Sequence, residues 1–358
     1  MDAATGAAVA AAATGAAVAA VAAAATGATG AAAATGASNK PQVVGRFAPS
    51  PSGRMHLGNA FSALMAWLSA RSAGGRMVLR IEDLDPRASS RERAATLIDD
   101  LSWLGLTWDE GPHFQSERLD VYDEAVARLG EMGLTYPCFC SRAELHAASA
   151  PHASDGTYLY AGTCRGLGAE EVARRSALRT PAIRLRVPAA DDPAGKIAWR
   201  DLGFGPRQEV LAEECGDFLI RRSDGVTAYQ LAVVVDDCLM GVNQVVRGCD
   251  LLGSSARQTY LARLLGFEAS AFGHVPLLVA PDGRRLSKRD RDLDLGALRE
   301  AGVRPERVVG ALAAAAGLVD AGTEAAAADL VGAFSWARIA VCRAEIVVDK
   351  DFLARPVG

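Results

Sequence analysis

The sequence lacks an excess of positive charge. Its 38 Lys and Arg residues are outnumbered by 42 Asp and Glu residues, which gives a formal net charge of -4. No overall basic field therefore draws the chain to nucleic acid or to an anionic membrane surface. Any RNA partner must be met by local basic patches instead.

Residues 1–39 lack almost everything except Ala, Gly, Thr and Val. A signal peptide would need a basic region, but Asp2 is the only charged residue before Lys40. A spanning helix would want Leu, Ile or Phe, whereas here Thr-Gly steps interrupt an alanine tract whose unit at 4–12 recurs almost unchanged at 13–21. We predict that 1–40 is a disordered, dispensable tail, or that the start codon was assigned too early, and we expect no membrane segment.

The seven cysteines lack the even count and regular spacing of a disulfide framework. Cys138 and Cys140 stand one residue apart, and Cys164 follows. Three thiols at this spacing favour a zinc site in a reducing compartment, so we expect a cytoplasmic protein. The remaining cysteines have no partner spacing and are predicted to be ordinary core or surface residues: Cys215, Cys238, Cys249 and Cys342.

Alternating apolar patterns predict an α/β fold from residue 41 onward. A strand at 43–47 leads through a glycine turn into an apolar helix, and a second strand at 77–81 ends directly in Glu82. Ser89, with Glu92 three residues later, forms a capping box that predicts the start of the next helix. Repeated units of this kind build a parallel, doubly wound sheet.

A second acidic strand end is predicted at 231–237, where the run LAVVV meets Asp236 and Asp237. Ligands of open α/β sheets bind beyond the carboxyl ends of the strands, so Glu82 and Asp236 are candidate site residues. Acidic residues in such positions can also simply cap the next helix.

Breaks in the pattern divide the rest of the chain. Residues 136–210 contain the cysteine cluster, Gly and Pro breaks and a short strand at 182–187, and we interpret them as an insertion in a domain spanning 41–292. A small helical region is predicted over 293–358, with Pro305 at a helix start.

Two stretches carry phosphate-binding chemistry. In HLGN at 56–59, a turn into a helix exposes backbone N–H groups to an anion, and His56 can donate a hydrogen bond to phosphate oxygens. In the basic loop at 280–292, Lys288 offers a point charge to a triphosphate. Taken alone, the first could be an ordinary turn histidine and the second a solvated run of charges.

Taken together, HLGN at 56–59 and RLSKR at 285–289 resemble the HIGH and KMSKS signatures of class I aminoacyl-tRNA synthetases. FAPSPSG at 47–53, RIEDLDP at 80–86 and GPHFQSERLDVY at 111–122 resemble the glutamyl-tRNA synthetase catalytic domain. Asn59 replaces the second histidine of HIGH and Arg285 the first lysine of KMSKS; both keep hydrogen-bonding or charged character, so we expect an active enzyme with altered ATP affinity at most.

A closer resemblance, through 221–237 and 241–261, is to the small bacterial glutamyl-queuosine tRNA(Asp) synthetases. The likeness covers about 41–340. Full glutamyl-tRNA synthetases continue after KMSKS into a large helical anticodon-binding region, whereas only 69 residues follow Arg289 here. The resemblance therefore implies a Rossmann-type class I catalytic domain with a zinc-bearing insertion, a small C-terminal helical region and no anticodon-binding domain.

The resemblance also implies site residues. It implies a glutamate-binding set of Arg46, Phe47, Ala48, Pro49, Ser50, Glu82, Tyr229 and Arg247. It implies catalytic roles for His56 and Lys288, which bind ATP together with Gly58 and Asn59. For one structural zinc ion it implies Cys138, Cys140, Tyr160 and Cys164, although His146 or His152 could replace the tyrosine as the fourth ligand.

The implied activity is that of a ligase. Glutamate would be activated with ATP and Mg²⁺ as glutamyl-adenylate, and then transferred to queuosine at the wobble position of tRNA(Asp). We expect a monomer. The alternatives are a truncated glutamyl-tRNA synthetase that charges the tRNA 3′ end, a non-catalytic tRNA-binding paralogue, and a small-molecule nucleotidyltransferase. Retention of His56 and Lys288 weighs against the second, and the RIEDLDP element with the cysteine insertion weighs against the third.

Overall fold

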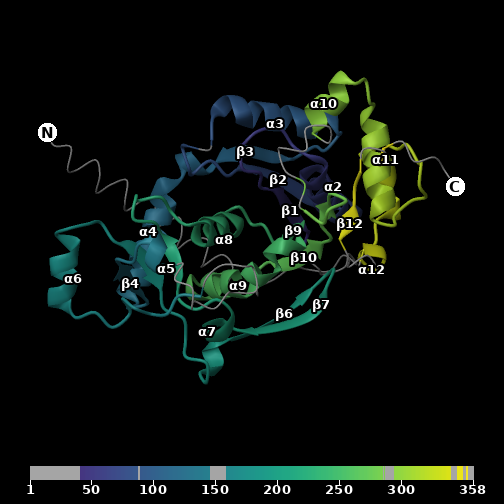
Figure 1. The fold of residues 1–358 in the computed structure, drawn as a ribbon. Coiled ribbons are helices and arrows are strands. Elements are labelled where there is room, and N and C mark those ends of the chain that lie inside the picture. Colours follow the sequence, from purple (N-terminus) through teal and green to yellow (C-terminus); the bar gives the residue numbers. More distant parts are fainter. Residues whose placement is uncertain are drawn as a thin grey trace, which may run out of the picture.

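The first strands and helices alternate as the apolar pattern predicts. In a computed structural model, which describes residues 41–87, 89–145, 159–284, 286, 294–339, 345–349 and 352–353, strands β1, β2 and β3 form one sheet with parallel neighbours (Figure 1). The predicted strands at 43–47 and 77–81 are confirmed. The elements of this half are β1 (Val44–Phe47), α2 (Leu57–Ser72), β2 (Arg76–Ile81), α3 (Arg91–Trp103), β3 (Glu110–Phe114), η1 (Gln115–Glu117) and α4 (Leu119–Glu131).

Helix α2 is buried on most of its surface, because sheet strands pack on one side and C-terminal helices on the other. It ends at a tight turn before β2, where Gly74 has a φ of +66°. A Cβ atom on Gly75 would lie 2.3 Å from the carbonyl oxygen of Val43. Glycine is therefore required for the chain to pass from α2 into β2 next to β1.

Helix α3 begins one residue later than the capping box predicts. The Oγ atom of Ser90 accepts the N3 hydrogen bond from the backbone N–H of Arg93, at 3.2 Å. The hydroxyl of Ser89 instead donates to the carbonyl oxygen of Asp85. Two adjacent serines offer the same capping chemistry, so the sequence alone does not fix the boundary.

The strand predicted at 231–237 is wrong, because these residues lie in helix α8 (Tyr229–Leu239). All residues from 231 to 237 are buried, since α8 packs between α4, α9 and β8. A helix buried on every side shows no polar face, so its apolar run resembles that of a buried strand. Asp236 consequently does not follow a strand, whereas Glu82 follows β2 as predicted.

A second set of parallel strands continues the first. Contacts of Asn243 with Val44, and of Arg46 with Val246, show that β9 (Gln244–Gly248) runs beside β1 in the same direction. Strand β10 (Ala271–Val275) pairs in parallel with β9, and β6 pairs in parallel with β10. The carboxyl ends of β1, β2 and β9 therefore meet at one edge.

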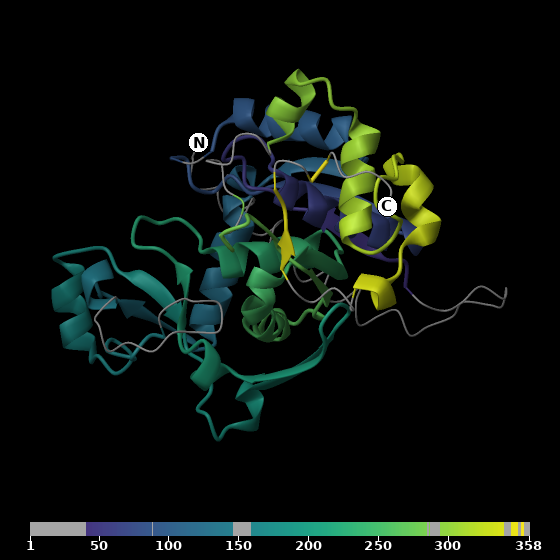
Figure 2. The ribbon, with the colours of Figure 1, turned by 45° about the vertical axis from the view of Figure 1, so that its right-hand side comes forward.

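The insertion folds around its own antiparallel sheet, with strand order β4–β5–β8, and lies opposite the C-terminal helices in both views (Figures 1 and 2). Its hairpin of β6 and β7 reaches back to the main sheet. The predicted strand at 182–187 is observed as β5. The elements are β4 (Thr135–Cys138), α5 (Arg142–Leu145), α6 (Ala169–Ser176), β5 (Ala182–Leu185), η2 (Pro193–Gly195), β6 (Lys196–Asp201), β7 (Gly205–Val210), α7 (Leu211–Glu214) and β8 (Phe218–Arg221).

C-terminal elements pack onto α2 and share its hydrophobic core. A helix begins at Pro305 as predicted, and the short strand β12 pairs in parallel with β11. Within the described residues, no helix combines the length and apolar character needed to cross a bilayer. The remaining elements are η3 (Cys249–Ser254), α9 (Ser255–Leu264), β11 (Leu278–Val279), α10 (Leu295–Glu300), α11 (Pro305–Ala315), η5 (Ala327–Ala333), α12 (Trp336–Ile339) and β12 (Ile346–Val347).

Candidate active site

A cavity of about 760 Å³ opens where the carboxyl ends of β1, β2 and β9 meet the N-terminus of α2. Every residue predicted to bind glutamate lines this cavity, and so do the predicted ATP-binding residues that lie in the described part of the chain. Lys288 and Arg285 lie outside the described residues. The predicted residues on the cavity wall are Arg46, Phe47, Ala48, Pro49, Ser50, His56, Gly58, Asn59, Glu82, Tyr229 and Arg247.

His56 is the N-cap of α2. Its Nδ1 atom accepts hydrogen bonds from the backbone N–H groups of Gly58 and Asn59, at 3.1 and 3.3 Å. A ring nitrogen that accepts cannot carry the proton, so the neutral imidazole holds its proton on Nε2. A Cβ atom on Gly58 would lie 3.0 Å from the ring, so glycine at this position lets the ring close on the helix end. The imidazole therefore occupies the backbone N–H groups of Gly58 and Asn59, which the sequence predicted to face an anion, and Nε2–H is the donor that the ring itself contributes at this end of the helix.

Arg46 and Glu82 are held by a buried network centred on Arg80. The Nη1 atom of Arg80 donates to Asp237 Oδ1 at 2.6 Å, and Nη2 donates to Glu82 Oε1 at 3.2 Å. Arg46 Nε lies 3.7 Å from the same Asp237 oxygen and has no hydrogen-bond partner among the described residues. Asp236 adds a third carboxylate, with Oδ2 3.6 Å from Arg80 Nε.

In this network the pKa values of Arg80 and Glu82 both lie above their usual values, for different reasons. Burial by itself would lower the pKa of Arg80, but Asp237, Glu82 and Asp236 together raise it far above its usual value. Burial raises the pKa of Glu82, a shift that Arg80 and Arg46 oppose. A cation entering the cavity beside Glu82 would lower the pKa of that carboxyl again.

Glu82 also fixes the two cavity loops relative to each other. Its backbone N–H donates to the carbonyl oxygen of Pro49 at 3.0 Å. The loop after β2 is thereby tied to the loop after β1, which contains most of the predicted glutamate-binding residues. The sequence patterns predict no role for Arg80 or Asp237. The one feature that could have indicated these residues is their charge inside an otherwise apolar strand or helix.

Arg247 is the last residue but one of β9 and lines the cavity as a buried cation surrounded by neutral acceptors. Its Nη1 atom donates to Gln258 Oε1 at 2.8 Å, and Nη2 donates to Ser255 Oγ at 3.1 Å. Within the described residues it forms no ion pair with a carboxylate. Burial, reinforced by nearby Arg46, lowers the pKa of Arg247, although a guanidinium remains protonated. An anion in the cavity is the partner that this charge lacks.

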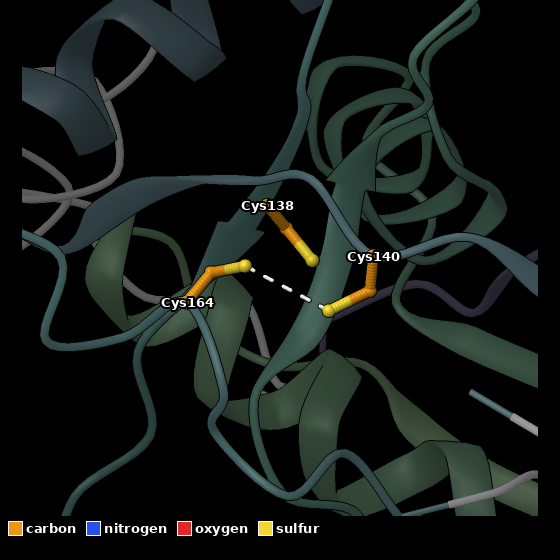
Figure 3. Close-up of side chains that lie close together, drawn as sticks. All are labelled: Cys138, Cys140 and Cys164. Carbon is orange, nitrogen blue, oxygen red and sulfur yellow. Dashed lines mark hydrogen bonds between the residues drawn. The ribbon is translucent and has the colours of Figure 1, made fainter. Parts of the chain in front are cut away.

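The cysteine cluster lies in the insertion, away from this cavity. The Sγ atoms of Cys138, Cys140 and Cys164 converge, and those of Cys140 and Cys164 are 3.7 Å apart (Figure 3). Tyr160 OH lies 3.6 Å from the Sγ atoms of both Cys138 and Cys140. His146 and His152, the alternative fourth ligands, lie outside the described residues. The structure thus brings the four predicted ligands together.

Neighbouring donors support negative charge on the sulfurs. Arg184 Nε donates to Cys138 Sγ at 3.3 Å, and burial alone would raise the pKa of that thiol, yet hydrogen bonds, led by the one from Arg184, lower it. Burial raises the pKa of Cys140 to about 11, with crowding by the other thiols adding to the rise. These surroundings favour the thiolate at Cys138 and disfavour it at Cys140, and a cation at the centre of the cluster would favour it at both.

Comparison with known proteins gives a family-level match over most of the chain. Residues 42–332 match the catalytic domain of class I tRNA synthetases (E and Q). The glutamyl-Q tRNA(Asp) synthetase of Symbiobacterium thermophilum is 52% identical over 309 residues, covering 83% of this chain and 94% of the relative. That of Nitratidesulfovibrio vulgaris is 47% identical, covering 87% and 98%. Glutamate–tRNA ligase 2 of Alkalilimnicola ehrlichii is 46% identical, but this chain covers only 58% of its length.

The fold is similar to that of a solved structure. The glutamate-tRNA synthetase from Elizabethkingia anophelis superposes with a TM-score of 0.72 at 25% identity, covering 87% of this chain and 69% of that one.

Proposed function

Because this chain belongs to the class I tRNA synthetases of the E and Q type, and within them to the glutamyl-Q tRNA(Asp) synthetases, we propose that it activates L-glutamate with ATP and transfers it to queuosine at the wobble position of tRNA(Asp). The observation that carries this proposal is the charge pattern of the cavity. Arg46 and Arg247 are buried cations on its wall, and Glu82 is an anion on the same wall. This pattern complements two carboxylates and one ammonium group, which are the charged groups of glutamate.

The residues divide the work of the first step. A carboxylate oxygen of glutamate forms a bond to the α-phosphorus of ATP, and the bond from that phosphorus to the pyrophosphate oxygen breaks. His56 Nε2–H and the positive end of the α2 dipole would stabilise the charge that develops on the phosphates of bound ATP. Mg²⁺ bound with ATP would supply further positive charge, and Lys288 is proposed as a cationic partner.

The second step transfers the activated acyl group. A hydroxyl oxygen of queuosine attacks the acyl carbon of glutamyl-adenylate, the bond to AMP breaks, and the product is an ester. Little covalent chemistry is required of the protein, whose task is to position the two substrates.

The test is transfer of labelled glutamate, with ATP, onto tRNA(Asp) that contains or lacks queuosine, followed by ribonuclease digestion. We expect label in the anticodon fragment only when queuosine is present. Label on the 3′-terminal adenosine would instead identify a truncated glutamyl-tRNA synthetase, and no label on either tRNA would favour a non-catalytic tRNA-binding protein.

We also propose that Cys138, Cys140, Cys164 and Tyr160 hold one structural zinc ion. Zinc ligands at 2.0–2.3 Å from a tetrahedral centre lie about 3.5–3.8 Å from one another. The observed separations of 3.7 Å between two sulfurs and 3.6 Å between sulfur and phenol oxygen fit that geometry. Four protein ligands leave no open position for catalysis, so the ion would hold the insertion together. Cys138, Cys140 and Cys164 form no disulfide with one another, which accords with a proposed cytoplasmic location.

Cys138→Ser is expected to reduce the zinc content from about one ion per chain to a small fraction, because a hydroxyl is a poor substitute for a thiolate ligand. Metal analysis of the purified protein measures this. Cys238→Ser is the matched control, since Cys238 lies in α8 outside the cluster, and it should retain the metal. Equal zinc content in both variants would contradict the assignment.

A further inference from the structure

The guanidinium of Arg247 forms a hydrogen bond to the buried side chain of His274. Its Nε atom donates to Nε2 of His274 at 3.0 Å. His274 lies on β10, the strand next to β9, and its side chain is fully buried. The Nε contact determines the direction in which the guanidinium plane faces, because Nε is the point where that plane joins the side chain.

His274 is in turn fixed by Asp201. Its Nδ1 atom lies 2.5 Å from Asp201 Oδ2, and both side chains are excluded from solvent. The other oxygen, Asp201 Oδ1, accepts backbone N–H groups of Gly203, Phe204 and His274, at 2.8 to 3.1 Å. Three donors at a single oxygen fix the carboxylate plane, and Oδ2 remains to face the imidazole.

These contacts allow only one arrangement of protons. Arg247 Nε can only donate, so His274 Nε2 must accept, and the imidazole proton must lie on Nδ1 and point at Asp201. Burial lowers the pKa of His274, which agrees with a neutral ring. Burial alone would raise the pKa of Asp201, but hydrogen bonds, led by the one from His274, lower it, which agrees with a carboxylate.

We propose that Asp201 and His274 are positioning residues for glutamate binding: Asp201 fixes the tautomer of His274, and His274 holds the guanidinium of Arg247 towards the cavity. This inference rests on the proposed function, because it requires glutamate to be the ligand of Arg247.

The arrangement places the negative charge at a distance. A carboxylate in direct contact with Arg247 would neutralise it and compete with the substrate. With a neutral imidazole between them, Asp201 compensates the buried cation through one intervening ring and does not itself occupy the guanidinium.

Asp201 comes from the insertion. It ends β6, which pairs with β10 at Phe272. The chain then turns so tightly that a Cβ atom on Gly203 would lie 2.1 Å from the carbonyl oxygen of His274. The β6–β7 hairpin therefore helps to orient the cavity wall through Asp201.

The decisive variant is Asp201→Asn, which preserves shape. Three backbone donors require an oxygen at the Oδ1 position, so the new amide nitrogen must face His274 Nδ1. Because that amide nitrogen can only donate, His274 Nδ1 must accept, and the imidazole proton moves to Nε2. The Nε2–H group then points at the Nε–H group of Arg247, so the hydrogen bond between the two residues is lost. We expect the KM for glutamate to rise about 10- to 100-fold, while the KM for ATP and kcat change less than about threefold.

His274 provides a second, independent measurement. His274→Leu removes both contacts and should raise the KM for glutamate by a similar factor. His274→Gln should recover most of the loss, because one amide can donate to Asp201 and accept from Arg247. In the double variant, Asp201→Asn should add nothing to His274→Leu, since Asp201 acts through the histidine.

The matched control is Asp217→Asn, which also alters a buried carboxylate. The Asp217 side chain accepts hydrogen bonds from Tyr136 and Arg165 and has no contact with Arg247 among those of the described residues. It should leave the KM for glutamate unchanged. If wild-type enzyme activates glutamate but Asp201→Asn retains the wild-type KM, or His274→Gln fares no better than His274→Leu, the positioning role is wrong. If wild-type enzyme does not activate glutamate at all, the proposed function has failed instead.

Discussion

Arg80→Met is expected to lower the free energy of unfolding by about 3–5 kcal/mol. Arg80 is fully buried and is the shared cation of three carboxylates, on Glu82, Asp236 and Asp237. Methionine fills a similar volume without charge, so packing changes little, but the three buried carboxylates are left close together without their main counter-ion. Urea denaturation of the purified variant measures the loss.

Arg76→Met is the matched control, because Arg76 lies on the same strand and pairs with a single carboxylate, Glu110, at the surface. An exposed ion pair of this kind contributes about 0–1 kcal/mol. Equal losses of unfolding free energy in the two variants would show that the buried ion pairs of Arg80 contribute no more to stability than the exposed ion pair of Arg76. A folded Arg80→Met protein should also bind glutamate more weakly, because Glu82 loses the hydrogen bond that orients it.

Arg247→Ala is expected to lower kcat/KM for glutamate about 30- to 4,000-fold. Removing one partner of a buried charged contact costs about 2–5 kcal/mol, and each 1.4 kcal/mol is a factor of ten. The residues around Arg247 offer neutral acceptors, so its charge is available to a substrate carboxylate. Pyrophosphate exchange at varied glutamate concentration gives this value, and the KM for ATP should be almost unaffected.

The surface residue Arg263, at the end of α9, provides the control for that measurement. Arg263→Ala removes an arginine close in sequence but outside the cavity lining. The kcat/KM for glutamate should stay at the wild-type value in Arg263→Ala and fall only in Arg247→Ala. Similar kcat/KM values for both would mean that Arg247 does not contact glutamate, and would also remove the basis for the role of His274 and Asp201.

Helix α3 could be predicted because it has one apolar and one polar face. Strands β1 and β2 are buried on both faces and could be predicted from their short apolar runs, and Pro305 marks a helix start through its fixed backbone angle. The pattern fails at α8, where Val233, Val234 and Val235 are all buried. β-branched residues in a short apolar run favour a strand locally, and only the tertiary packing of α8 decides for a helix.

The cavity wall could be predicted from sequence to the extent that its residues lie in recognisable stretches. Residues 46–50, 56–59 and Glu82 meet at one sheet edge because the strands are parallel, and the thiols gather because their spacing is short. The contact of Asp201 with His274 joins positions with no shared sequence pattern. Such a contact depends on the register of β6 against β10, which local sequence does not specify.

The C-terminal packing has a consequence for how the chain folds during synthesis. Helix α2 begins at residue 57, yet α11 and η5 pack against its apolar surface. The Trp336 side chain donates a hydrogen bond to Ser69 Oγ of α2 at 3.1 Å. Strand β12 at 346–347 completes the neighbouring two-stranded sheet. On a ribosome, part of the apolar surface of α2 stays uncovered until segments that follow it by about 250 to 280 residues have been translated, since α2 begins at 57, α11 at 305, η5 at 327 and α12 at 336. Contacts of such long sequence separation form slowly, so the nascent nucleotide-binding half would depend on chaperones or on its own local strand pairing until these segments emerge.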